Sequence, residues 1–186
     1  MRLTERYDEA LMYAARLHRE QTRKGTEIPY VSHLLAVSAL ILEHGGDEDQ
    51  AIAGLLHDAA EDQGGQARLA EIESMFGPGV SRIVADCTDS WTDPKPPFRE
   101  RKEAYLAHLP QKPQRSLLVS LADKTHNATA ILFDLRHIGE DLWPRFNGGK
   151  EGTIWYYGAV SDILHQRVPG LLSKQLRETV AAFNHF

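Results

Sequence analysis

The spacing of the apolar residues is the feature that most limits what this 186-residue chain can fold into. Between Tyr7 and Leu17, apolar side chains recur every three or four residues, as they do on one face of an α-helix. The same period returns in segments 98–109 and 114–135, and no segment alternates apolar and polar residues as a half-buried strand does. The sequence therefore predicts an all-α protein.

Glycine and proline mark where the predicted helices end. The segment 90–97 contains three prolines, and proline lacks a backbone donor and disfavours helix in the preceding residue, so we expect an irregular surface loop there. A second loop is expected at 139–152. The predicted helices cover 7–17, 32–44, 50–62, a short segment ending at 76, and then 80–88, 98–109, 114–135, 153–166 and 171–183.

The composition narrows the class of protein. Hydrophobic residues make up 42% and charged residues 25%, which is close to the globular norm and excludes collagenous and intrinsically disordered chains. The net charge of −5 leaves no general basic excess, which argues against a nucleic-acid-binding module. We therefore expect one packed domain that is either an enzyme or a binding domain.

Cysteine content and hydropathy indicate the compartment. Cys87 is the single cysteine, so an intrachain disulfide and a cysteine-rich zinc site are both excluded. No apolar run approaches the roughly 20 residues of a membrane span, and the charged N-terminus does not resemble a signal peptide. These features predict a cytoplasmic protein that does not bind membranes; they do not predict its oligomeric state.

The segment from Leu55 to Asp62, Leu-Leu-His-Asp-Ala-Ala-Glu-Asp, carries the strongest chemical signal. It places an imidazole and three carboxylates on an apolar stretch, and burying ionised carboxylates is costly unless they are paired or bind a metal. We therefore predict His57 and Asp58 as metal ligands. On one continuous helix, Glu61 and Asp62 follow them by one turn and are expected to handle water.

Two further residues extend this set. His33 begins the second predicted helix, and Asp123 lies in an apolar part of a long one. Each has an ordinary explanation when taken alone, because a lone histidine is more often structural and Asp123 is placed to pair with Lys124 or Arg115. With the His57-Asp58 pair they give two imidazoles and two carboxylates, which suit Mn²⁺, Fe²⁺ or Zn²⁺ with positions open for water and phosphate.

Several segments resemble the HD-domain hydrolases of the Rel/SpoT group, and more narrowly the small alarmone hydrolases. They are Arg23–His33, Leu55–Asp62 and Leu121–Asn127, continued by Phe76-Gly77, Cys87–Asp89 and Glu100–Lys102. The resemblance covers most of the chain in the same order. It implies one all-helical HD hydrolase domain over residues 1–186, with a metal-site core at about 23–135 and C-terminal helices at about 153–185.

The activity that the resemblance implies is hydrolysis of the 3′-pyrophosphate of guanosine tetra- or pentaphosphate, the alarmones of the stringent response. The products would be pyrophosphate and GDP or GTP, and the expected metal is Mn²⁺, with another divalent ion as the alternative. The resemblance assigns metal binding to His33, His57, Asp58 and Asp123, catalysis on water to Glu61 and Asp62, and substrate binding to Arg23, Lys24 and Asn127.

Two other functions remain open on the sequence. One is an HD phosphohydrolase acting on another nucleotide, such as an adenosine alarmone analogue or a phosphorylated dinucleotide. The other is a catalytically silent nucleotide sensor, against which the intact Glu61-Asp62 pair argues. Thr125 and Ala130 depart from the family's pattern, which leaves the choice between guanine and adenine open.

Two groups of residues have competing explanations. Arg101 and Lys102 are weaker phosphate-binding candidates, because the mixed charge run around them is more often a solvated helix face. Trp155, Tyr156 and Tyr157 are able to stack on a base, but aromatic residues at helical spacing more often belong to the core. We therefore leave both groups out of the predicted site.

Overall fold

The computed structural model describes residues 2–92 and 94–186, and this part of the chain contains helices and no β-strand. The helices are α1 (Glu5–Leu17), α2 (Val31–Glu43), α3 (Glu48–Leu56), α4 (Ala59–Asp62), α5 (Gly65–Phe76), α6 (Pro78–Cys87), α7 (Phe98–His108), α8 (Gln114–Ile138), α9 (Gly149–Arg167) and α10 (Leu171–Ala181), with the 3₁₀ turns η1 (Leu109–Gln111), η2 (Gly139–Arg145) and η3 (Ala182–His185). The predicted all-α class is confirmed. Asp93, in the predicted loop 90–97, lies outside the described residues.

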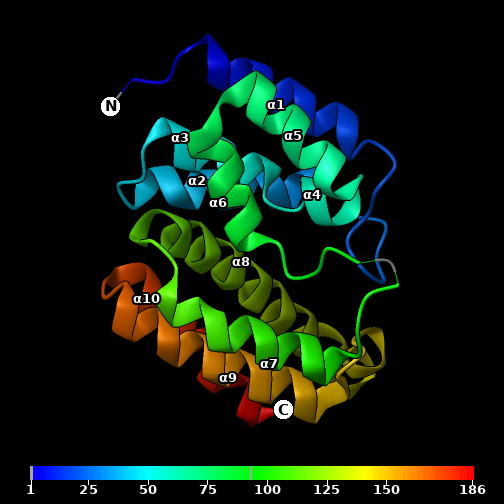
Figure 1. Cartoon of the computed structure of the whole chain (residues 1–186). Coiled ribbons are helices and arrows are strands. Elements are labelled where there is room, and N and C mark those ends of the chain that lie inside the picture. The colour runs from blue at the N-terminus through cyan, green and yellow to red at the C-terminus, as the bar shows by residue number, and fades with distance from the viewer. Residues whose placement is uncertain (1, 93) are drawn as a thin grey trace.

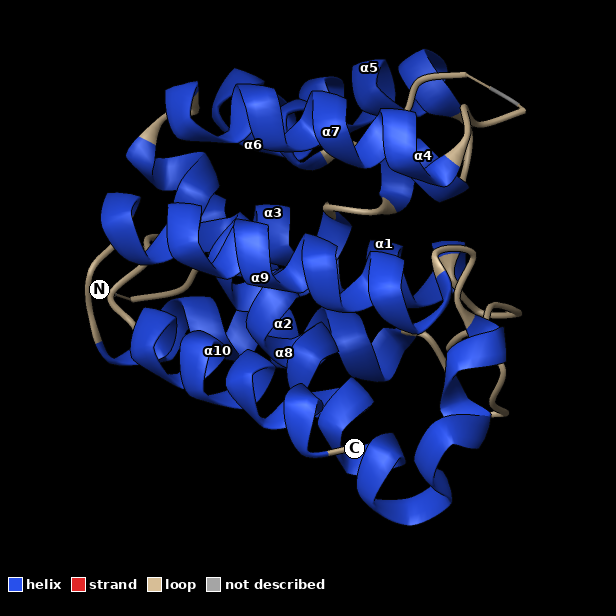
Figure 2. Cartoon of the chain, turned by 90° about the horizontal axis from the view of Figure 1, so that it is seen from below, coloured by secondary structure: helices blue, strands red, loops and turns tan. Residues whose placement is uncertain are grey.

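The long helix α8 lies in the middle of the fold. It packs against α2, α3 and α6 on one side and against α9 and α10 on the other. Figure 1 shows α1 to α6 above α8 and α7, α9 and α10 below it. In the view from below, the loops join the ends of these helices (Figure 2). Side chains in the first half of α8 are therefore placed to meet residues from α2 and α3. Among the described residues, none of the helices has the length and apolarity that a membrane span requires.

Side-chain caps begin two of the helices. The Thr4 hydroxyl accepts from the Arg6 amide at the start of α1. At the start of α3, the Asp47 carboxylate accepts from the Gln50 amide at 3.0 Å while the Gln50 side chain accepts from the Asp47 amide. Asp47 is therefore the N-cap of α3.

The predicted continuous helix 50–62 is wrong, because α3 ends at Leu56 and α4 begins at Ala59. The His57 side chain supplies the reason. Its Nδ1 donates to the Gly54 carbonyl at 2.9 Å, and a histidine that satisfies one of the last carbonyls in this way helps to end a helix. His57 and Asp58 keep αR dihedrals, and the Asp62 amide donates to the Asp58 carbonyl at 2.9 Å, so Asp62 still follows Asp58 by one turn although the continuous helix is interrupted.

Gly149 and Gly152 lie inside helix α9, although the sequence predicted that they belong to the loop before it. The predicted boundary at Thr153 is wrong, because α9 begins at Gly149, and the first half of the predicted loop 139–152 is the 3₁₀ turn η2. A Cβ on Gly148 would lie 2.5 Å from the Phe98 ring, and one on Gly152 would lie 3.1 Å from it. These glycines allow α7 and α9 to approach each other.

The buried face of α3 anchors the segment that carries His57. Ile52, Leu55 and Leu56 have no exposed surface, and neighbouring alanines on the same helix are buried with them. Burial of apolar side chains is the main stabilising contribution to such a core. The position of His57 at the end of this helix is therefore fixed by packing.

Truncation of Leu56 to alanine should lower the free energy of unfolding by about 2–5 kcal/mol, the usual cost of a cavity in a close-packed core. Leu171→Ala is the matched control, because Leu171 is 77% exposed and its truncation should change stability by no more than about 0.5 kcal/mol. Chemical denaturation of both variants measures the difference, and equal effects would contradict the assignment of Leu56 to the core.

Candidate active site and metal centre

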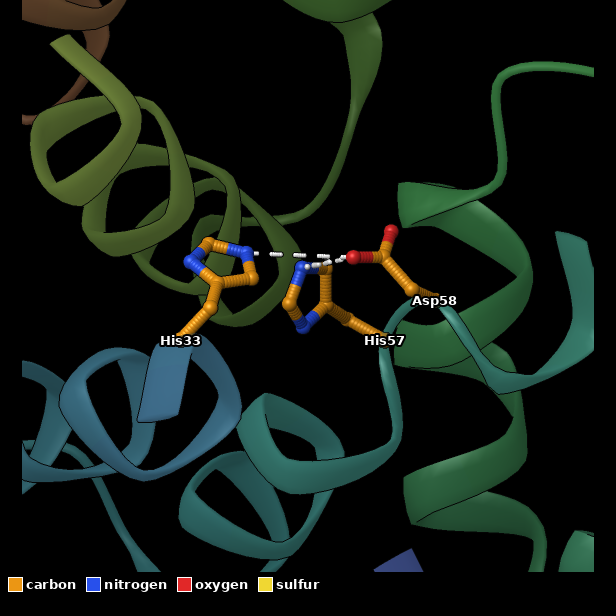
Figure 3. A group of neighbouring side chains, drawn as sticks. All are labelled: His33, His57 and Asp58. Carbon is orange, nitrogen blue, oxygen red and sulfur yellow. Dashed lines mark ion pairs between the residues drawn. The ribbon is translucent and has the colours of Figure 1, made fainter. Parts of the chain in front are cut away.

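The structure brings the four predicted metal ligands together from three separate helices. His33 lies in the first turn of α2, His57 and Asp58 follow α3, and Asp123 lies in the first half of α8. Figure 3 shows the rings of His33 and His57 and the carboxylate of Asp58 directed toward one another, and their ligand atoms all lie within 4.8 Å. Oδ1 of Asp123 lies 3.3 Å from His33 Nε2 and 3.6 Å from His57 Nε2.

The two imidazoles present nitrogens that are suited to a metal ion. The Nε2 atoms of His33 and His57 are buried and make no hydrogen bond. Nδ1 of His57 donates to the Gly54 carbonyl, which leaves the Nε2 lone pair directed at the carboxylates. These nitrogen lone pairs are buried and face carboxylate oxygens. The nitrogen and the oxygen repel each other unless a cation or a proton lies between them. Two nitrogens and two carboxylates arranged in this way fit a divalent metal ion.

Charges at the centre also favour a cation. Burial lowers the pKa of His57, but Asp58 and Asp123 outweigh this effect and hold the pKa well above its ordinary value. Burial alone would raise the pKa of Asp58, yet the neighbouring His57 lowers it overall. Burial lowers the pKa of His33. In the absence of metal, the carboxylates thus hold a proton on His57, and a divalent ion would displace that proton.

Asp123 is linked to two cationic side chains. Its Oδ2 accepts from Lys124 at 2.7 Å, so the ion pair with Lys124 exists, whereas Arg115 pairs with acidic residues at the start of α3. Its Oδ1 accepts from the Asn127 amide, and the Asn127 carbonyl accepts from Arg23 at 2.6 Å. Both ends of the Asn127 amide are therefore engaged, and a nucleotide would have to replace one of these partners.

Two further side chains contact the predicted ligands, and the sequence analysis gave them no role. The Tyr30 hydroxyl donates to Asp58 Oδ2 at 2.5 Å, and Nδ1 of His126 lies 2.8 Å from Nδ1 of His33. Burial lowers the pKa of His126 to about 4, so this imidazole is neutral and able to accept from His33. Both residues lie within three positions of a predicted ligand, but only the tertiary contact distinguishes them from their neighbours.

Glu61 and Asp62 line a separate cavity of about 410 Å³ beside the loop after α6. Glu61 accepts from Lys95 at 2.7 Å and from the Asp89 amide at 2.8 Å. Asp62 accepts from Gln21 at 2.9 Å and lies 3.4 Å from the same Lys95 ammonium. The two predicted catalytic carboxylates are thus held together by donors from the N-terminal segment and from the proline-containing loop.

Arg23, Lys24 and Asn127 all line a second cavity of about 500 Å³, a size typical of small-molecule sites. His126, which contacts His33, also lines it, so this cavity approaches the metal centre. Gly25, next to Lys24 in this loop, has a φ of +72°, a backbone angle that favours glycine. The predicted substrate-binding residues therefore face one hollow.

The two groups left out of the predicted site have clear positions. Arg101 and Lys102 are not a solvated face, because their side chains are 13% and 14% exposed and both donate to Asp89. The sequence missed this because Asp89 lies on the far side of the proline-containing loop. Tyr156 and Tyr157 belong to the core as expected, although Tyr157 also reaches the wall of the larger cavity.

This all-helical fold brings two histidines and two aspartates from separate helices to one point. That arrangement is typical of a class of all-α proteins that hold a metal ion between their helices. The HD domain family matches residues 10–150, and the chain belongs to this family.

Named relatives share this family. The chain is 40% identical over 138 residues to the guanosine-3′,5′-bis(diphosphate) 3′-pyrophosphohydrolase MESH1 of Xenopus tropicalis, over 73% of this chain and 72% of that protein. It is 38% identical to human MESH1 over the same shares. It is also 33% identical to the bifunctional (p)ppGpp synthase/hydrolase SpoT of Escherichia coli, over 68% of this chain and 18% of SpoT.

Solved structures agree with this placement. One, described as a metazoan ortholog of SpoT that hydrolyses ppGpp, superposes with a TM-score of 0.77 at 29% identity and covers 96% of both chains. A Listeria monocytogenes protein superposes with a TM-score of 0.71 at 26% identity, over 82% of this chain and 99% of its own. The fold is therefore shared over nearly the whole chain.

Proposed function

We propose that this protein hydrolyses the 3′-pyrophosphate of guanosine tetra- or pentaphosphate and releases pyrophosphate with GDP or GTP. The observation that carries the proposal is the convergence of His33, His57, Asp58 and Asp123 beside a cavity that presents Arg23 and Lys24. The names of the MESH1 and SpoT relatives support the substrate. In this proposal, residues 1–186 form a single HD hydrolase domain.

His33, His57, Asp58 and Asp123 would hold a divalent ion, for which we propose Mn²⁺. When bound, such an ion lowers the pKa of water and offsets the charge of the phosphate. The two Nε2 atoms, once His57 has lost its proton, and the two ionised carboxylates would hold it, and Tyr30 and His126 fix the orientations of Asp58 and His33.

Glu61 and Asp62 act on the attacking water in this proposal. Both Glu61 oxygens accept hydrogen bonds, so its carboxylate is held in one orientation. Each of these oxygens keeps a second lone pair, which accepts a proton in this proposal as water attacks the phosphorus bonded to O3′. The bond between O3′ and phosphorus then breaks, O3′ takes up a proton, and pyrophosphate leaves.

The proposal is tested by a metal-supplemented assay of guanosine and adenosine 3′-diphosphates beside ordinary mononucleotides. Pyrophosphate and orthophosphate are measured separately, because each identifies the bond that is broken. We expect pyrophosphate from the guanosine substrate. Release of orthophosphate alone, or binding of nucleotide with no turnover, would replace the proposal with a different phosphohydrolase or with a silent sensor.

The loop that carries Arg23 and Lys24 gives a prediction about affinity for the nucleotide substrate. Lys24→Ala should raise KM by about tenfold with little change in kcat, because a charge-assisted contact with phosphate is lost while the metal centre is untouched. Arg23→Ala should raise KM and also change the preference between guanine and adenine substrates. Steady-state kinetics at two ionic strengths measure both effects. Lys174→Ala, on a remote face, is the control, and unchanged KM in both loop variants would place nucleotide binding elsewhere.

Loss of the Tyr30 hydroxyl should weaken metal binding by about 10–100-fold, the usual effect of removing a hydrogen bond that orients a ligand. Tyr7→Phe is the matched control, because the Tyr7 hydroxyl bonds to Ser38 at 2.8 Å rather than to a predicted ligand. Titration of Mn²⁺ into metal-free Tyr30→Phe and Tyr7→Phe measures the difference. Equal affinities would show that Tyr30 does not support Asp58.

A further inference from the structure

One face of α8 leads from the metal centre along the larger cavity. Asp123, Asn127 and Asp134 lie on this face, because intervals of four and eleven residues return to nearly the same direction at 3.6 residues per turn. At 1.5 Å per residue, Asp134 lies about 16 Å along the helix from Asp123. Asn127 and Asp134 both line the cavity. A nucleotide with its 3′-phosphate near Asp123 would therefore extend its base toward Asp134.

Asp134 forms an ion pair at this end of the cavity. Arg145, in the turn η2, donates from Nη1 to Asp134 Oδ2 at 3.1 Å, and both side chains remain about a third exposed. Arg145 also lines the cavity. The pair therefore presents a carboxylate and a guanidinium side by side to any ligand that enters.

The position of Arg145 is set by the loop that carries Arg23 and Lys24. A Cβ on Gly25 would lie 2.7 Å from Cδ of Arg145, so only glycine lets the loop backbone pack on the stem of this arginine. The φ of +72° at Gly25 independently favours glycine. The loop that carries Arg23 and Lys24 therefore packs directly against the Asp134–Arg145 pair.

The remaining wall between the two ends is largely apolar and suits a flat ring. It is formed by Ile28, Ile131, Phe133, Leu142, Phe146 and Tyr157. Sites of this kind hold a planar ligand by its faces and select it by a few polar groups at its edge. The polar groups at this end are those of Asp134 and Arg145.

We propose that Asp134 and Arg145 select guanine by reading the edge of the base; this inference rests on the proposed function, which places the 3′-phosphate at the metal centre. Guanine carries two adjacent donors, N1–H and the 2-amino group, which match the two acceptors of the Asp134 carboxylate. Its O6 acceptor matches the free N–H groups of Arg145. Adenine presents a lone pair at N1, which the carboxylate repels.

The test exchanges the donor at position 2 of the base for an acceptor. Asp134→Asn keeps an acceptor for N1–H and offers an amide N–H to O2 of xanthine, whereas the 2-amino group of guanine meets a donor. We expect the ratio of kcat/KM for the xanthosine and guanosine 3′-diphosphates to rise by about 10²-fold or more in this variant, because a mismatched buried donor is strongly rejected. An unchanged ratio would overturn the inference.

Arg145→Gln gives an independent second arm. It should weaken the guanosine and inosine substrates by a similar factor, since both carry O6, and it should affect a 2-aminopurine substrate much less. Asp162→Asn is the control, because it alters an exposed aspartate–arginine pair, with Arg177 at 3.6 Å, outside this cavity. A uniform loss across all three bases in Arg145→Gln would assign this arginine a structural role and remove it from base recognition.

Binding without catalysis separates this inference from the proposed function. Calorimetry with GDP and with xanthosine 5′-diphosphate, in the absence of metal, should show the same shift of preference toward xanthine in Asp134→Asn. If the wild-type protein releases no pyrophosphate but this shift is seen, the proposed function fails and base selection stands. If pyrophosphate is released but Asp134→Asn still prefers GDP to the same degree, base selection fails and the proposed function stands.

Discussion

Removal of the divalent metal should abolish hydrolysis, and Asp123→Asn should prevent its full recovery when Mn²⁺ is returned. Asp123 Oδ1 lies within 3.6 Å of both imidazole Nε2 atoms, and a neutral amide is a much weaker ligand than a carboxylate. We expect the bound metal of Asp123→Asn to fall far below one ion per chain, with turnover falling in parallel. Elemental analysis and the pyrophosphate assay measure the two quantities.

Two further variants test whether the loss of metal in Asp123→Asn is due to the loss of a ligand. Asp141→Asn changes an exposed aspartate and should leave the metal content intact. Because Asp123→Asn also removes the carboxylate partner of buried Lys124, His33→Gln provides a variant that takes away a nitrogen ligand without leaving a cation unpaired. Full metal occupancy in Asp123→Asn would remove Asp123 from the ligand set, and full turnover by rigorously metal-free protein would contradict metal dependence itself.

Glu61→Gln should lower turnover by about 10²-fold or more while the protein keeps its fold and its metal. This is the usual size of the effect when general acid–base assistance is lost. The amide still fills the space of the carboxylate between Lys95 and the Asp89 amide, but it cannot accept a proton from water. Single-turnover kinetics with Mn²⁺ present, beside a measurement of metal content, checks both parts of the expectation.

The control for this variant is Glu71→Gln, which alters an exposed glutamate paired with Arg68 and should leave turnover unchanged. Substrate affinity should largely survive in Glu61→Gln. If metal content and turnover instead fall together, Glu61 is a ligand or a structural support, and the proposed division between metal-binding and water-activating residues is wrong.

The helical class could be predicted from sequence because the apolar period is a local property. The cap at Asp47 is also a local feature, because the residues that form it lie within four positions of one another. The positions of the glycines predicted the helix boundaries less well, because glycine occurs both where the chain reverses and where two helices pack closely. Gly148 and Gly152 lie where α7 packs against α9, and Phe98, which makes this approach necessary, is about 50 residues away in the sequence.

The candidate ligands could be selected from sequence because a histidine and several carboxylates are costly in an apolar segment unless something compensates them. The positions of these ligands relative to one another could not be predicted in this way. His57 Nδ1 donates to the Gly54 carbonyl, and the continuous helix expected over 50–62 is interrupted after Leu56. A hydrogen bond from a side chain to a nearby carbonyl, which residue spacing does not predict, helps to end α3 at this point.

The all-α class, the family and the residue types at the candidate metal centre could be read from the sequence, because they depend on periodicity and on motifs within short segments. The contacts between distant groups depend on the folded chain: Tyr30 meets Asp58, His126 meets His33, and Arg145 meets Asp134. Hydrogen bonds and ion pairs act over a few ångströms, and contacts at that range between separate helices depend on how the whole core packs.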